Sequence, residues 1–262
     1  MYNPAAVKPP MTFITLLAYD YRYAFDAIAS YYSIADQIIL GLDQDRLSWT
    51  RQPFLIDLDE VRAFIRRIDP AGKIRLIEGN FHSHEYPMDN DTQERNALSL
   101  HCPAGHWIVQ IDCDEILLNA GQFVAWLEQA GDTLDHSTLG AQWITVFKQF
   151  GDQVLVISPA SDGAPIATRS PGQYVNARWT RQPLVKSPLN LLHYSWGRTP
   201  QELRQKLGNW SHARDFDTEN FYRRWDGLSL ENYHQWHNFN PFKGPLWPAL
   251  AIARIARTPP PP

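Results

Sequence analysis

The feature that most constrains this chain is an apolar strand pattern that runs directly into three acidic residues. The segment from Trp107 to Ile111 is mostly hydrophobic, and Asp112, Asp114 and Glu115 follow with only one residue between the first two. A strand that is apolar at successive positions is normally buried on both faces, as in parallel sheets covered by helices. Carboxylates at its carboxyl end then lie where open α/β sheets bind ligands. The alternative is a buried strand followed by an ordinary acidic turn.

Clustered carboxylates of this kind suit a hard divalent cation. Mg²⁺ and Mn²⁺ prefer oxygen ligands and usually bridge one or two protein carboxylates to the phosphates of a bound nucleotide. The acidic strand end therefore predicts a metal ion or a polar substrate at this edge of the sheet.

Strand and helix patterns alternate four times before position 131. The strand patterns cover residues 13–19, 37–42, 73–77 and 106–111, and helical spacing follows each of them, with caps at Asp57, Asp91 and Asn119. Such alternation predicts parallel strands joined by right-handed crossovers. Residues 141–150 and 154–157 flank Gly151-Asp152, which predicts a hairpin and hence an antiparallel addition to the sheet.

Composition bounds the remaining possibilities. The 262 residues carry a formal net charge of -4, so no overall basic field favours nucleic acid as a partner. Two cysteines indicate neither a disulfide framework nor a structural zinc site, and we expect a reducing, cytoplasmic setting. No run of about 18 apolar residues occurs. The short apolar segment 246–257 either packs on the main domain or associates weakly with a membrane surface.

A second informative block begins at Arg198. Thr199 as N-cap, Pro200 at the first helical position and Glu202 predict a helix start. Helix amino termini bind phosphate through free N–H groups and the helix dipole, and Arg198 and Lys206 would add positive charge nearby. The alternative is an ordinary amphipathic helix without a ligand. A helix that buries one face can also bind phosphate at its amino terminus, so both interpretations can hold together.

The segment from Trp107 to Glu115, the preceding Glu94-Arg95-Asn96 helix and the later His193 and Lys206 resemble glycosyltransferases of the GT-A fold, closest to family 2. The resemblance spans residues 12–215. It implies an α/β nucleotide-sugar-binding domain with a mostly parallel Rossmann-like sheet. We expect this domain over residues 12–198 and a helical, Trp-rich extension over residues 199–258 packed on it.

The resemblance also implies roles for particular residues around a nucleotide-sugar donor. Asp114 would coordinate Mn²⁺ or Mg²⁺ on the donor diphosphate, with His193 as a further ligand. Asp112 would contact the ribose or the metal through water, and Glu115 would support them. Asp112, Asp114 and Glu115 are thus the expected catalytic residues. The residues that would contact the nucleotide sugar are Tyr19, Asp20, Asp43, Arg95, Arg198 and Lys206, with the last two on the pyrophosphate and Asp43 on the base. One departure from the family pattern is Arg46-Leu47-Ser48-Trp49, which stands where a Ser/Gly-rich segment is commoner.

We therefore expect a metal-dependent, inverting transferase that moves a sugar to a carbohydrate or another hydroxyl-bearing acceptor. One alternative is a divalent-metal hydrolase that uses His82, His84 and Asp112. Another is a catalytically inactive nucleotide-sugar binder. We expect Asp114→Asn to abolish Mn²⁺-dependent nucleotide binding and to leave the fold intact, because a solvent-facing carboxylate at a strand end contributes little to packing.

Overall fold

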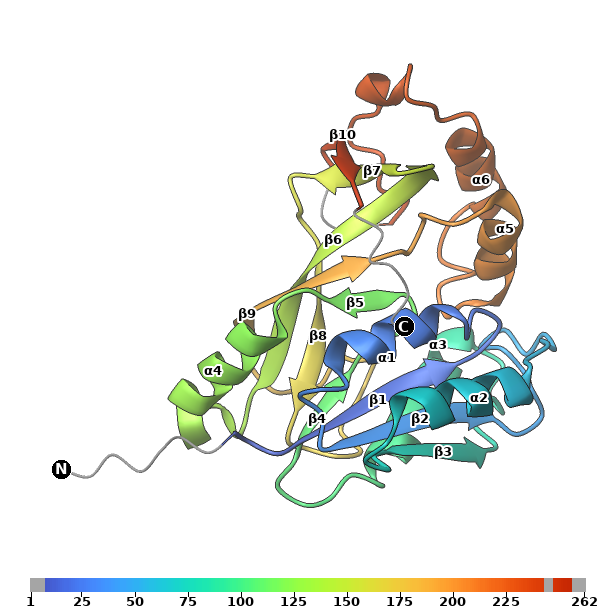
Figure 1. The fold of residues 1–262 in the computed structure, drawn as a ribbon. Coiled ribbons are helices and arrows are strands. Elements are labelled where there is room, and N and C mark those ends of the chain that lie inside the picture. The colour runs from blue at the N-terminus through green and yellow to red at the C-terminus, as the bar shows by residue number, and fades with distance from the viewer. Residues whose placement is uncertain (1–7, 243–246, 256–262) are drawn as a thin grey trace.

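Four parallel strands form the part of the sheet that positions the acidic residues. They are β1 (Met11–Leu17), β2 (Gln37–Asp43), β3 (Ile74–Gly79) and β4 (Trp107–Gln110), in the order β3-β2-β1-β4. The computed structural model describes residues 8–242 and 247–255 (Figure 1). The expected α/β class with parallel central strands is confirmed. Because these strands run in one direction, the residues that follow β1 and β4 emerge at the same edge.

Helices cover both faces of these strands, as the apolar strand patterns require. Helices α1 (Tyr23–Tyr31) and α2 (Leu58–Ile68) lie on one face, and α3 (Pro87–Ser99) lies on the other (Figure 1). Along β1, Phe13 stacks on Tyr31 of α1 with ring centroids 4.4 Å apart. The next residue along β1, Ile14, belongs to the cluster that contains Leu98 of α3. Successive residues of β1 are therefore buried against different helices.

The capping residues explain where two of these helices begin. The carboxylate of Asp57 accepts hydrogen bonds from the backbone N–H groups of Asp59 and Glu60, so it caps α2 as predicted. Helix α3 begins at Pro87, four residues before the predicted cap at Asp91. Proline is already preorganised for the first helical position, and Asp91 lies inside the helix.

The antiparallel half of the sheet is larger than the predicted hairpin. Strands β6 (Thr138–Phe150) and β7 (Gln153–Ser158) form that hairpin, and β8 (Gly163–Thr168) pairs antiparallel with both β4 and β6. Strand β9 (Leu184–His193) runs parallel to β6 and pairs antiparallel with β5 (Glu115–Leu117). The β5–β9 pair brings His193 opposite Glu115. Helix α4 (Ala120–Ala130) and a 3₁₀ turn, η1 (Gly131–Leu134), connect β5 to β6.

The C-terminal part packs on the antiparallel end of the sheet. It contains α5 (Pro200–Asn209), α6 (Thr218–Asp226), a short 3₁₀ turn η2 (Tyr233–Gln235) and the strand β10 (Ala249–Arg254) (Figure 1). Its aromatic core also includes Phe147 of β6, so this core extends across the predicted boundary at residue 198. The expected helical extension thus ends in a strand.

The apolar segment 246–257 is partly accounted for by that strand. Strand β10 pairs antiparallel with β7, and Trp247 and Leu250 are buried in the aromatic core. This packing uses apolar side chains that a membrane surface would need. Residues 246, 256 and 257 lie outside the described residues. Within the described part of the chain, every helix is too short or too polar to span a bilayer.

One lysine joins the C-terminal part to the sheet. The Lys148 ammonium group on β6 donates to the carbonyl oxygens of Trp225, Asp226 and Leu228 at 2.7–2.9 Å, at the end of α6. We predict that Lys148→Met lowers the free energy of unfolding by about 1.5–3 kcal/mol, because three backbone carbonyl groups lose a charged donor. Urea unfolding measures this change. Lys186→Met, at an exposed lysine, is the control, and equal stability of the two variants would contradict the prediction.

Candidate functional site

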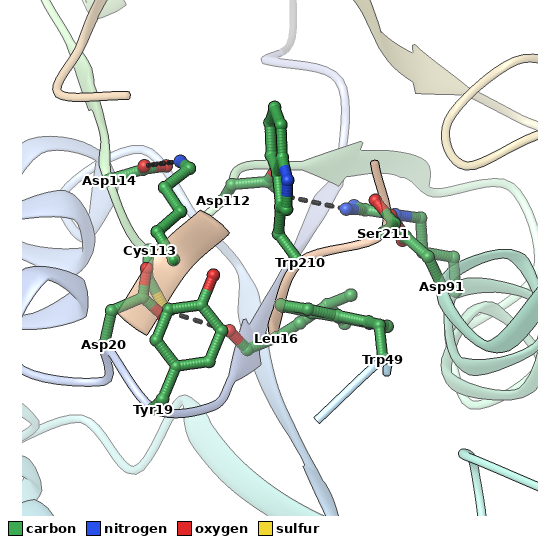
Figure 2. Close-up of a pocket in the computed structure, with 12 residues that line it drawn as sticks. Leu16, Tyr19, Asp20, Trp49, Asp91, Asp112, Cys113, Asp114, Trp210 and Ser211 are labelled. Carbon is green, nitrogen blue, oxygen red and sulfur yellow. Dashed lines mark hydrogen bonds and ion pairs between the residues drawn. The ribbon is translucent and has the colours of Figure 1, made fainter. Parts of the chain in front are cut away.

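A cavity lies at the carboxyl ends of β1 and β4, with a volume of about 430 Å³ that includes space open to solvent. The residues after β1, the Asp112–Asp114 turn after β4, α3 and α5 line it. Figure 2 shows the aromatic rings of Tyr19, Trp49 and Trp210 around the same space as Asp112 and Asp114. The edge predicted from the acidic strand end is therefore the edge that carries the cavity.

Asp114 is the centre of a buried ion-pair cluster. Its Oδ2 atom accepts from Arg198 Nη2 at 2.5 Å and from Lys206 Nζ at 2.7 Å, and its Oδ1 atom lies 3.6 Å from His193 Nε2. Burial opposes ionisation of Asp114, but Lys206, His193 and Arg198 outweigh it and hold its pKa well below the usual range. Asp114 is therefore a buried carboxylate compensated by two cations, which corrects the expectation that it faces solvent.

Asp112 belongs to a second set of ion pairs. Arg95 Nη2 donates to Asp112 Oδ1 at 2.9 Å, and Arg178 Nη2 lies 3.6 Å from Asp112 Oδ2. Burial again opposes ionisation, but Arg178 and Arg95 lower the pKa of Asp112 to about 2. Arg95 is itself held by Asp91 one helical turn earlier, at 2.5 Å. Asp112 is thus ionised at neutral pH, and its side chain is still 32% exposed.

Glu115 is fully buried and has a positioning role. Its two carboxylate oxygens accept a bidentate pair of hydrogen bonds from Arg178, at 2.7 and 2.8 Å. They also accept from the backbone N–H of Asp112 and from the indole N–H of Trp143. With all its surface buried, Glu115 cannot reach a substrate, so the predicted catalytic role is corrected to one of fixing the turn after β4.

The two residues that follow β1 connect this cavity with a neighbouring one. Tyr19 and Asp20 line both cavities, and Arg198 lines the second. Asp20 accepts from Arg198 Nη2 at 2.8 Å, and burial raises the pKa of Asp20. Tyr19 and Asp20 therefore lie on the walls of both cavities, and their contact with a donor stays a prediction.

Asp43 lies outside the cavity, and its carboxylate holds the backbone of two nearby loops through hydrogen bonds. Its two oxygens accept from the backbone N–H groups of Asp45, Leu47, Phe81 and His82, and its exposed fraction is 1%. A carboxylate used in this way has no oxygen to offer a nucleotide base. The predicted base contact is therefore corrected to a structural role at the end of β2.

The three predicted metal ligands do not meet at one point. Asp114 and His193 face each other, whereas Asp112 pairs with arginines. The described residues contain no group of three His, Cys, Asp or Glu side chains placed to hold a metal ion. The Oδ2 atom of Asp114 carries two positively charged donors instead. This arrangement of side chains does not suit Mn²⁺ or Mg²⁺. A bound metal ion therefore stays a prediction from the resemblance alone.

The hydrolase alternative finds no support in the placement of its histidines. His82 is buried, with one ring nitrogen on the carbonyl oxygen of Leu47 and the other 2.9 Å from Glu94 Oε2. His84 is tied through its backbone to Asn90. His82 therefore fastens the loop after β2 to α3, and the proposed metal group of His82, His84 and Asp112 is not assembled.

Several residues of the site carried no sequence signal. Arg178 lies between β8 and β9 with no motif around it, yet it holds both Asp112 and Glu115. Trp49 and Trp210 line the cavity. Other tryptophans of this chain are buried in the core, so the residue type alone does not indicate a place in the site. Asp91 was read as a helix cap and instead pairs with Arg95. Only Arg95 at the next turn of the same helix, at i+4, could have indicated that pair.

No protein-family model and no curated protein sequence matches this chain. Among solved structures, 4-diphosphocytidyl-2C-methyl-D-erythritol synthase has a TM-score of 0.38 at 10% identity, over 69% of this chain and 90% of that chain. S. aureus TarS 1-349 has a TM-score of 0.31 at 12% identity, over 54% of this chain and 37% of that chain. Mannose-6-phosphate isomerase from Helicobacter pylori has a TM-score of 0.33 at 10% identity, over 84% of this chain and 81% of that chain. All three TM-scores are below 0.5, so none of these likenesses indicates a function for this chain.

The cluster on Asp114 makes a direct prediction about stability. Asp114→Asn removes the negative charge and leaves Lys206 buried without a charged partner, so we expect the free energy of unfolding to fall by about 3 kcal/mol. Guanidinium unfolding of the variant measures this. Asp45→Asn, at an exposed carboxylate in the loop after β2, is the matched control. If Asp114→Asn were as stable as the wild type, Asp114 would not be the anchor of this cluster.

Proposed function

We propose that this chain transfers a sugar from a nucleoside diphosphate donor to a hydroxyl-bearing acceptor. The observation that carries the proposal is a buried ammonium group, Lys206 Nζ, on the wall of a cavity at the carboxyl ends of parallel strands. That edge is where open α/β sheets bind nucleotides. The resemblance in the strand from Trp107 to Glu115 supports the same class of donor.

The walls of the cavity offer distinct surfaces to the parts of such a donor. Lys206 is assigned to the diphosphate, with Arg198 behind it. The rings of Tyr19, Trp49 and Trp210 are flat apolar surfaces on which a base or a sugar can stack. Asp112 is assigned to the ribose, because it is an ionised acceptor that keeps part of its surface open.

The reaction places its electrostatic demand on the diphosphate. The bond between the anomeric carbon and the β-phosphate oxygen breaks, and its electron pair leaves with the nucleoside diphosphate. The acceptor hydroxyl oxygen forms the new bond to the anomeric carbon and releases its proton to a base. A single displacement of this kind inverts the anomeric configuration. Because the leaving group gains negative charge, a cation fixed beside it lowers the barrier.

A panel of UDP, GDP, ADP and CDP tests the donor class. At least one of them should raise the melting temperature, because a ligand that binds only the folded state stabilises it. Lys206→Met should abolish that shift, whereas Arg204→Met, on the exposed side of the same helix, should leave it unchanged. Absence of a shift with every nucleotide would reject the proposal. Binding of a nucleotide sugar without hydrolysis or transfer would identify an inactive binder.

A further inference from the structure

We propose that this site binds the donor diphosphate without a divalent metal ion, with Lys206 as the cation that contacts the phosphates and Arg198 as the cation that keeps Asp114 neutralised. This inference rests on the proposed function, since it concerns the same diphosphate. It differs from the metal-dependent site that the resemblance implies, and it follows from how the charges are arranged.

Both cations converge on one oxygen atom. Asp114 Oδ2 accepts from Arg198 at 2.5 Å and from Lys206 at 2.7 Å. A magnesium ion would bind such an oxygen at about 2.0–2.1 Å and would have to displace these donors. It would then lie close to two positive charges in a buried setting, where repulsion is weakly screened. The Oδ2 atom of this carboxylate is therefore already occupied.

The two cations differ in what they line. Lys206 is on the wall of the cavity beside Asp112, whereas Arg198 is fully buried and lines the neighbouring cavity with Tyr23 and Glu202. A buried charge that loses its only partner is strongly destabilised. Asp114 has two partners, so Lys206 can turn to a phosphate while Arg198 stays in place. This duplication makes Lys206 available to a ligand.

The other residues of the predicted metal site also provide little negative charge for a divalent cation. Asp112 is paired with Arg95 and lies near Arg178, and His193 is a partly buried imidazole that adds no negative charge. The two sets of ion pairs together contain four cations and five carboxylates. They are Arg95, Arg178, Arg198 and Lys206, with Asp20, Asp91, Asp112, Asp114 and Glu115. Such a nearly balanced set has little excess negative charge to attract a dication.

An unused donor lies beside Lys206. Trp210, one helical turn after Lys206, lines the same cavity, and its indole N–H is buried without an acceptor among the described residues. Its ring centroid lies 5.3 Å from Lys206 Nζ. A buried N–H group without a partner is unfavourable, and phosphate oxygens are strong acceptors. The pair of Lys206 and Trp210 therefore offers an anion one charged and one neutral donor.

Isothermal titration tests the inference with the nucleoside diphosphate that gives the largest thermal shift, in excess EDTA and in excess MnCl₂. We expect dissociation constants within about threefold of each other in the two buffers. Lys206→Met should weaken binding about 10- to 100-fold in both, as expected for a lost charged hydrogen bond. Lys206→Arg, which keeps the charge, should retain most of the affinity, and the melting temperature of each variant checks that it folds.

Each outcome has a definite meaning. Binding in MnCl₂ that disappears in EDTA would overturn this inference and leave the proposed function standing. Affinity unchanged by Lys206→Met would also overturn it, since another group would then hold the phosphates. If no nucleoside diphosphate binds in either buffer, the proposed function fails and this inference fails with it.

Discussion

The contact of Asp114 Oδ2 with Arg198 and Lys206 is the interaction on which the site depends. It joins the turn after β4 to the residues after β9 and to helix α5, which are 84 and 92 positions away along the chain. Helix α5 is thereby fixed beyond the carboxyl ends of the parallel strands, where Lys206 and Trp210 close one side of the cavity.

Opposite charges in this cluster stabilise one another in a setting that disfavours each of them alone. Asp112 pairs with Arg95 and Arg178, Glu115 also pairs with Arg178, and Asp114 pairs with Arg198 and Lys206. The turn after β4 is therefore fixed at three points. A fixed set of charges needs little rearrangement when a ligand arrives, which is the condition for effective electrostatic stabilisation of a transition state. The buried ion pairs therefore fix the geometry of the site as well as stabilising the fold.

Local sequence rules predicted the parts of the fold that local interactions determine. The apolar run of β1, the Asp57 cap of α2 and the Thr199 capping box of α5 lie where periodicity and cap chemistry put them. Strand β9 was missed because its two pairings join distant segments and leave no simple alternation. The start of α3 differs from the predicted cap at Asp91 because the helix already begins at Pro87.

In the candidate site, too, the sequence predicts local features but not long-range contacts. An acidic strand end predicts where the cavity lies, because parallel strands bring their carboxyl ends to one edge. It does not predict what each carboxylate touches. Arg178 comes from a loop 63 positions after Glu115, and the bidentate pair they form has no trace in spacing or composition. The residue types of Asp114 and Asp43 indicated ligands, but their long-range partners give each of them a structural role.

A crystal structure with a bound nucleoside diphosphate, grown in MnCl₂ and measured at a wavelength where manganese scatters anomalously, tests the central claim most directly. The account predicts phosphate oxygens within hydrogen-bond distance of Lys206, Arg198 still on Asp114, and no anomalous peak at either carboxylate. A manganese peak between Asp112 and Asp114, with Lys206 displaced from the diphosphate, would contradict it.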